Sequence, residues 1–346
     1  MQENRIVWIE HLRALATIGV ILLHVSAPLT YQFGSIPMSH WWIANGINSA
    51  VRCSVPLFFM ISGALLLSKE YEIGVFWKKR VTRVLLPFLF WSVVHILMNL
   101  VQKYHTGELH TSADYVQAVS GKLQSGVAFH YWFVYVLVGI YLFIPILGKW
   151  IRAASNKEIV YFLALWLMFT FLSQTAFGNF RYFSSLSYFF SGSIGFVVLG
   201  YYLCFRAEFF KKIKSSFLVL LIIIGLIITT VGIYLLSVSV GKSSQTLYSY
   251  FTPNVMLVTV AVFLLISRQV IKNRIVGKTL SFVSKYSYGI YLSHILTLTV
   301  LTMLKIDGNF IYPLVGITLT SALCLGLSTL IVYLISRLPY GKYVAG

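Results

Sequence analysis

Apolar runs long enough to cross a lipid bilayer recur along almost the whole chain. Such a run needs about 20 helical residues, because each residue rises about 1.5 Å and the hydrocarbon core is about 30 Å thick. The composition agrees, since 58% of the 346 residues are hydrophobic and only 10% are charged. No soluble globular class has such a composition. We therefore predict an all-α, polytopic integral membrane protein.

The pattern of these runs predicts about ten transmembrane helices. They cover residues 12–31, 43–68, 84–102, 130–148, 159–174, 183–205, 217–237, 250–267, 286–304 and 311–336. The longest loop between them, about 103–129, is too short for a second folded core. We therefore expect residues 1–346 to form one membrane-embedded domain, with no separate soluble domain.

The net charge of +18 would suit nucleic acid if the basic residues were spread over one surface, but they lie in alternate loops. Cytoplasmic loops retain positive charge, so this alternation predicts that both termini are cytoplasmic. It also favours membrane lipids, not nucleic acid, as partners of the basic loops. The loops assigned to the outside hold only five of the 27 Lys and Arg residues, which are Lys103, Lys122, Arg181, Lys242 and Lys305.

Two ionisable side chains lie within the first apolar run. Arg13 and His24 are eleven positions apart, which places them about 20° apart around a helix and about 16 Å apart along its axis. At membrane depth such groups are costly unless they meet a partner, water or substrate, so the pair indicates a functional groove. The alternative is structural: Arg13 reaches a lipid phosphate and His24 bonds a neighbouring carbonyl.

A second intramembrane arginine, Arg52, shares a helical face with Asn45 and Asn48 at spacings i, i+3 and i+7. Its depth suits an anion or carbonyl site, and a structural tie between helices is the alternative. Pro56 follows and would free a backbone carbonyl inside the membrane.

Three further groups of residues could bind substrates. Lys79, Arg80 and Arg83 would lie at the cytoplasmic rim, where they suit either a phosphate-bearing ligand or lipid headgroups. His130, Trp132 and Tyr135 begin the fourth span and suit either an aromatic belt or a stacked sugar. Ser287, Tyr291 and His294 share one face of the ninth span, as a substrate site or as an interhelical polar cluster.

Two patterns are missing from the sequence. No Asp or Glu lies deep in any predicted span, which weakens an ion-coupled transporter. Cys53, Cys204 and Cys324 lie in apolar runs, and His105 and His110 lack ligand spacing, so we predict no metal site.

At these positions the chain resembles the acyltransferase-3 family of integral-membrane acyltransferases, whose first-span signature Arg-x10-His matches Arg13 and His24. The resemblance is greatest to the enterobacterial common antigen O-acetyltransferase branch, and Glu10 stands where many members carry Asp. We count Glu10 with Arg13 and His24 as candidate catalytic residues. The likeness extends over Trp8 to Leu15, residues 43–63, Lys79 to Pro87, His130 to Trp132, Tyr141 to Pro145, and Ser287 to His294.

The resemblance implies acyl-CoA as donor, with acetyl-CoA a co-substrate and no tightly bound cofactor. It implies as acceptor a hydroxyl of a surface glycan or its lipid-linked precursor, and a location in the bacterial inner membrane. We therefore predict a membrane-bound, acyl-CoA-dependent O-acetyltransferase. Alternatives are transfer of succinyl or another short acyl group, a glycan exporter or flippase without acyl transfer, and a silent partner in glycan assembly.

On this prediction His24 acts as general base toward the acceptor hydroxyl, and a covalent acyl-histidine is the alternative. Arg13 lies too far along the helix to reach the same carbonyl. We expect it to hold the CoA phosphates together with Lys79, Arg80 and Arg83, and Arg52 to bind the donor near its reacting carbonyl as oxyanion stabiliser. Asn48, His130, Trp132, Tyr135, Ser287, Tyr291 and His294 are the expected acceptor-binding residues.

Overall fold

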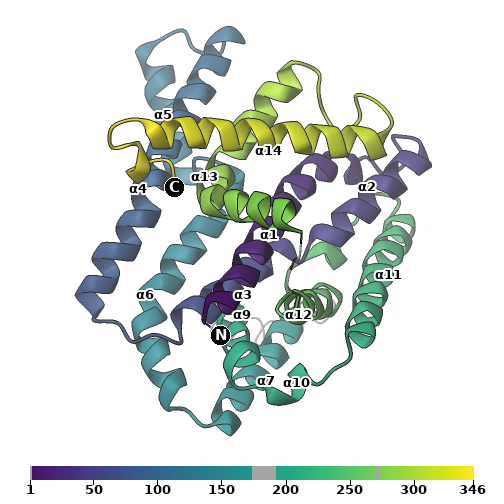
Figure 1. The fold of residues 1–346 in the computed structure, drawn as a ribbon. Coiled ribbons are helices and arrows are strands. Elements are labelled where there is room, and N and C mark those ends of the chain that lie inside the picture. Colours follow the sequence, from purple (N-terminus) through teal and green to yellow (C-terminus); the bar gives the residue numbers. More distant parts are fainter. Residues whose placement is uncertain (1, 174–191, 270, 272) are drawn as a thin grey trace.

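The computed structural model describes residues 2–173, 192–269, 271 and 273–346 (Figure 1). Throughout these ranges the regular structure is α-helix with short 3-10 turns, so the prediction of an all-α fold is confirmed. Seven helical stretches of the described chain are long and apolar enough to cross a membrane. The protein is therefore polytopic.

The helices follow one another with short connections. In chain order they are α1 (Gln2–Thr30), α2 (Met38–Val51), α3 (Ser54–Leu66), α4 (Ile73–His105), α5 (Ser112–Ser125), α6 (Trp132–Ala153), α7 (Asn156–Leu172), α9 (Ile194–Phe205), α10 (Glu208–Lys211), α11 (Ser215–Val240), α12 (Pro253–Ile266), α13 (Arg274–Met303) and α14 (Pro313–Arg337). The 3-10 turns are η1 (Phe129–Tyr131), η3 (Thr246–Tyr248) and η4 (Gly341–Tyr343).

Within the described residues, three of the ten predicted spans are not matched by a helix with the length and hydropathy of a membrane crossing. Helix α7 has 17 residues, and helix α9 covers only part of the predicted span 183–205, whose first residues, like Arg181, lie outside the described chain. Helix α13 has 30 residues but carries many polar side chains. The orientation in the membrane and the side of each terminus stay predictions.

The second predicted span is broken inside the membrane region. Helix α2 ends at Val51 and α3 begins at Ser54, so Arg52 lies at the break. Pro56 falls in the first turn of α3, and the carbonyl that its missing N–H would otherwise bind in a continuous helix is that of Arg52, four residues earlier. The break at Arg52 therefore agrees with the prediction that Pro56 frees a backbone carbonyl in this span.

Helix α1 runs through the middle of the bundle, where it packs against α2, α3, α12, α13 and α14 (Figure 1). Small residues let neighbouring helices approach closely, as in other membrane bundles. A Cβ at Gly19 would lie 2.1 Å from Ser54 Oγ, and one at Gly63 would lie 1.8 Å from the Val197 carbonyl oxygen. These contacts fix α1 against α3, and α3 against α9.

The predicted loop 103–129 contains a helix that the apolar pattern did not predict. Helix α5 begins at a capping box, in which Thr111 and Asp114 exchange hydrogen bonds. None of its residues is buried, and it stands at one end of the bundle beside the end of α4 (Figure 1).

Candidate active site

A cavity of about 790 Å³ opens at the end of the bundle where α4 begins, and we call it the basic cavity. No Asp or Glu lines it, and seven cationic residues do. These are Arg13, Lys78, Lys79, Arg80, Arg83, Lys285 and Lys342.

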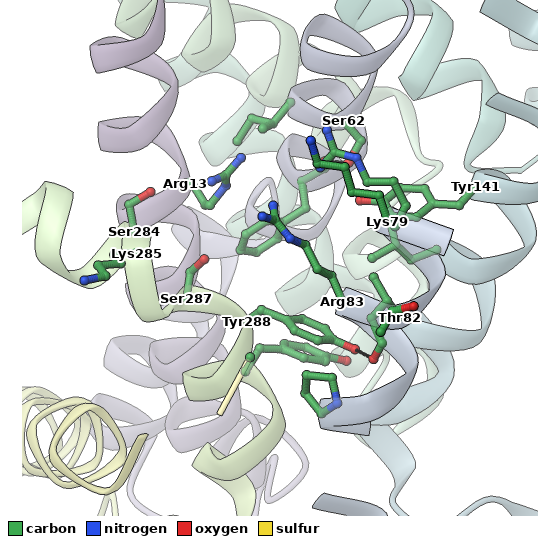
Figure 2. Close-up of a pocket in the computed structure, with 18 of the residues that line it drawn as sticks. Arg13, Ser62, Lys79, Thr82, Arg83, Tyr141, Ser284, Lys285, Ser287 and Tyr288 are labelled. Atoms are coloured by element: carbon green, nitrogen blue, oxygen red, sulfur yellow. Dashed lines mark hydrogen bonds between the residues drawn. The ribbon is translucent and has the colours of Figure 1, made fainter. Parts of the chain in front are cut away.

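Four segments far apart in sequence contribute these cations. Arg13 comes from α1, the run 78–83 from the early turns of α4, Lys285 from α13, and Lys342 from the turn after α14. Figure 2 shows the guanidinium groups of Arg13 and Arg83 pointing into the same space, whereas Lys285 points away. The Nζ atom of Lys285 instead lies 5.2 Å from the ring centroid of Tyr286.

In the described chain no side-chain carboxylate forms an ion pair with a cation of the basic cavity. The ion pair between Lys103 and Glu108 lies outside the cavity. The carboxylate of Glu10 accepts a hydrogen bond from Ser281 Oγ at 2.8 Å, which ties α1 to α13. Guanidinium groups without carboxylate partners suit phosphate oxygens, so the cavity suits a polyanionic ligand.

A second, much narrower cavity lies deeper along α1 and has no room for a water molecule. Phe58 and Tyr291 line both cavities, so these two side chains lie between them. Its other lining residues are Thr17, Val20, Ile21, Ile290 and His294.

Four histidines from four elements meet beyond the narrow cavity, and we call them the histidine cluster. The ring centroids of His24 and His294 are 5.2 Å apart, and those of His130 and His294 are 5.0 Å apart. His95 lies 5.5 Å from His130. The cluster therefore joins α1, α4, η1 and α13 around one point.

Several ring nitrogens of the cluster have no hydrogen-bond partner. His294 Nδ1 lies 2.6 Å from the Tyr291 carbonyl oxygen, which fixes the proton of the neutral ring on Nδ1 and leaves Nε2 as an acceptor. His294 Nε2 and both nitrogens of His130 are buried without partners in the described structure. Buried polar atoms are ordinarily satisfied, so unpartnered imidazoles point to a reacting group or ligand.

Across the described residues no group of three or more His, Cys, Asp and Glu side chains could hold a metal ion. A neutral imidazole can accept a proton and return it, so the histidine cluster suits proton transfer.

On the far side of the cluster from the basic cavity, the half-buried His24 lies against an exposed aromatic ring. The ring of Phe129 lies 5.3 Å from that of His24, and Phe129 is 69% exposed. Nearby, Trp132 stacks on Tyr250 with centroids 5.8 Å apart. Exposed aromatic faces of this kind can stack on a sugar.

Arg52 does not line the basic cavity but lies among polar and aromatic groups at the helix break. Its Nε donates to Asn48 Oδ1 at 2.7 Å, and its guanidinium lies 4.1 Å from the ring centroid of Tyr248. Tyr250 lies near the same guanidinium. Asn48 in turn donates to the Leu23 carbonyl and to Ser26 Oγ, so it holds Arg52 beside α1.

The structure therefore divides the sequence-predicted residues into separate groups. Ser287 and Tyr291 join Arg13, Lys79, Arg80 and Arg83 at the basic cavity, whereas His24, His130 and His294 form the cluster. Trp132 and Tyr135 are exposed near its far side. Glu10, Asn48 and Arg52 lie outside both cavities.

Sequence reasoning missed His95, Tyr141 and Lys342. His95 could have been found, because it is a lone histidine inside an apolar run, as His24 is. Tyr141 lines the basic cavity from α6, and no local pattern distinguishes it from other interfacial tyrosines. Lys342 comes to the cavity only because the segment after α14 folds back onto α13, where Gly289 contacts Ala345.

A cationic cavity at one end of a helical membrane bundle, with unpartnered imidazoles deeper inside, defines a membrane-embedded group-transfer enzyme. The comparison with known families agrees: the acyltransferase-3 family model, described as an acyltransferase domain, matches residues 6–337. The chain belongs to this family of membrane-bound acyltransferases, so the predictions of the family and of an acyltransferase are confirmed.

A relative in Bacillus subtilis (strain 168) is 25% identical over 358 aligned residues, which cover 97% of this chain and 92% of the relative. Its name is "Putative membrane-bound acyltransferase YfiQ". No solved structure matches the chain.

Proposed function

We propose that this protein is an O-acetyltransferase that moves an acetyl group from cytoplasmic acetyl-CoA to a hydroxyl of a surface polysaccharide or its lipid-linked precursor. The observation that carries this proposal is the sequence of sites along α1: a basic cavity, a narrow apolar cavity, and a histidine cluster just beneath the opposite surface. CoA, which stays on the cytoplasmic side of the membrane, can thus present its acetyl group to an acceptor that stays on the opposite side.

The basic cavity holds the CoA moiety. Its cations lie in segments that the alternation of charge assigns to the cytoplasm, where CoA occurs. Arg13, Arg80 and Arg83 bind the phosphates, and Lys79 adds positive charge at the rim. The pantetheine arm passes Phe58 and Tyr291 and brings the thioester to the histidine cluster.

His24 is the general base of the transfer. It removes the proton of the acceptor hydroxyl as the hydroxyl oxygen attacks the thioester carbon. The carbon–sulfur bond then breaks, and the same proton returns to the departing thiolate, so that free CoA and the acetyl ester are formed. His294, with Nδ1 held by the Tyr291 carbonyl, presents Nε2 as a second acceptor near the hydroxyl.

The acceptor approaches from the side of Phe129. Trp132 and Tyr250 offer a stacking platform for a sugar there, and Arg52 lies beside Tyr250 to stabilise developing negative charge. The resemblance to the enterobacterial common antigen branch favours a surface glycan in a bacterial inner membrane.

Inverted membrane vesicles that enclose a glycan extract from the native host in their lumen, and that receive labelled acetyl-CoA from outside, test the proposal. We expect label in the glycan and one free thiol for each acetyl group transferred. An exporter or flippase would release no thiol, and a succinyltransferase would prefer succinyl-CoA over acetyl-CoA. Either result would refute acetyl transfer.

A further inference from the structure

The narrow cavity has walls unlike those of the basic cavity beside it. Val20, Ile21 and Ile290 are at most 4% exposed and contribute branched apolar side chains. Each is carried by α1 or α13, which pack directly on one another. The walls are therefore set by two long helices and not by a loop.

The polar atoms that line the narrow cavity are nearly all satisfied within the protein. Thr17 Oγ1 donates to the Arg13 carbonyl at 2.9 Å, and the Tyr291 hydroxyl donates to the His130 carbonyl. His294 Nδ1 is held by the Tyr291 carbonyl. The one polar side-chain atom left without a partner among the lining residues is His294 Nε2.

This arrangement suits a small ligand with an apolar tail and one reacting polar end. The cavity lies between the basic cavity, which borders it at Phe58 and Tyr291, and His24, whose ring is 5.2 Å from that of His294. A thioester advancing from the basic cavity would bring its acyl group here before its carbonyl carbon reaches the histidine cluster.

We propose that the narrow cavity is the acyl-group subsite, and that Val20 and Ile290 limit the donor to short acyl chains. The inference rests on the proposed function. The cavity is too narrow to hold a water molecule as it stands, so the half-buried Phe58 ring moves aside when the acyl group enters. Chains longer than acetyl or propionyl meet Val20 and Ile290, which cannot yield without separating α1 from α13.

The test measures kcat/KM for acetyl-, propionyl- and butyryl-CoA in vesicles containing the full chain and the native glycan extract. Ile290→Ala and Val20→Ala enlarge the subsite, so the butyryl-to-acetyl ratio of kcat/KM should rise about tenfold or more. A difference of one methylene in an apolar pocket changes such a ratio by about that factor. Val20→Leu narrows the subsite and should lower the propionyl-to-acetyl ratio.

Ile317→Ala is the matched control, because Ile317, like Ile290, is 0% exposed but does not line the cavity. It should leave both ratios unchanged even if it lowers the amount of folded protein. Unchanged ratios in Ile290→Ala, Val20→Ala and Val20→Leu would overturn the acyl subsite while leaving acetyl transfer intact. A wild-type chain that transfers no acyl group from any of the three donors would instead refute the proposed function.

Discussion

Substitution of Arg13 tests whether donor binding is separate from the chemical step. Arg13 lines the basic cavity, is half-buried and has no carboxylate partner within 4.0 Å in the described chain. His24, where we place the chemistry, lies about 16 Å further along the same helix. Arg13→Ala should therefore weaken donor binding and leave the chemical step largely intact.

The size of the effect follows from burial. A hydrogen bond to a charged group contributes about 1.5–3 kcal/mol, which corresponds to a rise of about 10- to 150-fold in the KM for acetyl-CoA. Arg83 points into the same space but is exposed. A solvent-exposed ion pair is worth at most about 1 kcal/mol, so Arg83→Ala should raise the KM by no more than about fivefold.

The assay is a titration of acetyl-CoA against thiol release in inverted vesicles, at a fixed amount of glycan acceptor. Arg337→Ala serves as the matched control, because Arg337 is an exposed arginine at the end of α14 that does not line the cavity. Its KM should equal that of the wild type. A loss of kcat in Arg13→Ala at unchanged KM would refute the separation of binding from chemistry.

Four further changes test other parts of the molecule. His24→Ala should lower turnover by at least about 100-fold. The dissociation constant for acetyl-CoA, measured by calorimetry, should stay within about twofold of the wild-type value. Retained turnover would exclude His24 as the base. Asn48→Ala removes the buried amide that accepts from the half-buried Arg52 and donates to α1, so it should reduce stability by about 1–3 kcal/mol and lower the unfolding temperature in detergent. The exposed Asn309→Ala should change neither. Phe58→Ala removes a wall between the two cavities and should increase acetyl-CoA hydrolysis without acceptor; an unchanged hydrolysis rate would show that Phe58 does not exclude water. A cysteine introduced at Glu108 of a cysteine-free chain should react with an impermeant maleimide on intact spheroplasts, and protection there would reverse the predicted orientation.

Much of the arrangement along α1 could be predicted because it depends on helix geometry alone. Arg13, Thr17, Val20 and His24 follow one another at spacings of four, three and four residues, so they form one stripe. Arg13 lines the basic cavity, Thr17 and Val20 line the narrow cavity, and His24 belongs to the histidine cluster. The spacing along one face of α1 therefore predicts the order of the three sites without any information on the neighbouring helices.

The remaining parts depend on contacts that no local pattern encodes. The histidine cluster needs α4 beside α13, because the His95 Nε2 atom lies 3.1 Å from the Leu292 carbonyl oxygen. The surroundings of Arg52 were predicted only in part: Asn48 lies on the same helical face, whereas Tyr248 packs on the guanidinium from the segment after α11. The ionisable residues are unusual for their depth, but several of their partners come from elsewhere in the chain.

The closed boundary between the two cavities has a physical consequence for an enzyme that joins the two sides of a membrane. A path open from the basic cavity to Phe129 would let water reach the thioester and let protons cross. Phe58 and Tyr291 separate the cavities, and the hydroxyl of Tyr291 is held by the His130 carbonyl. The ring that can move is therefore Phe58, on the donor side, while the groups on the acceptor side stay fixed. If acetyl-CoA is the donor, as we propose, opening depends on its arrival, and the thioester reaches the imidazoles only while CoA itself fills the basic cavity and excludes water.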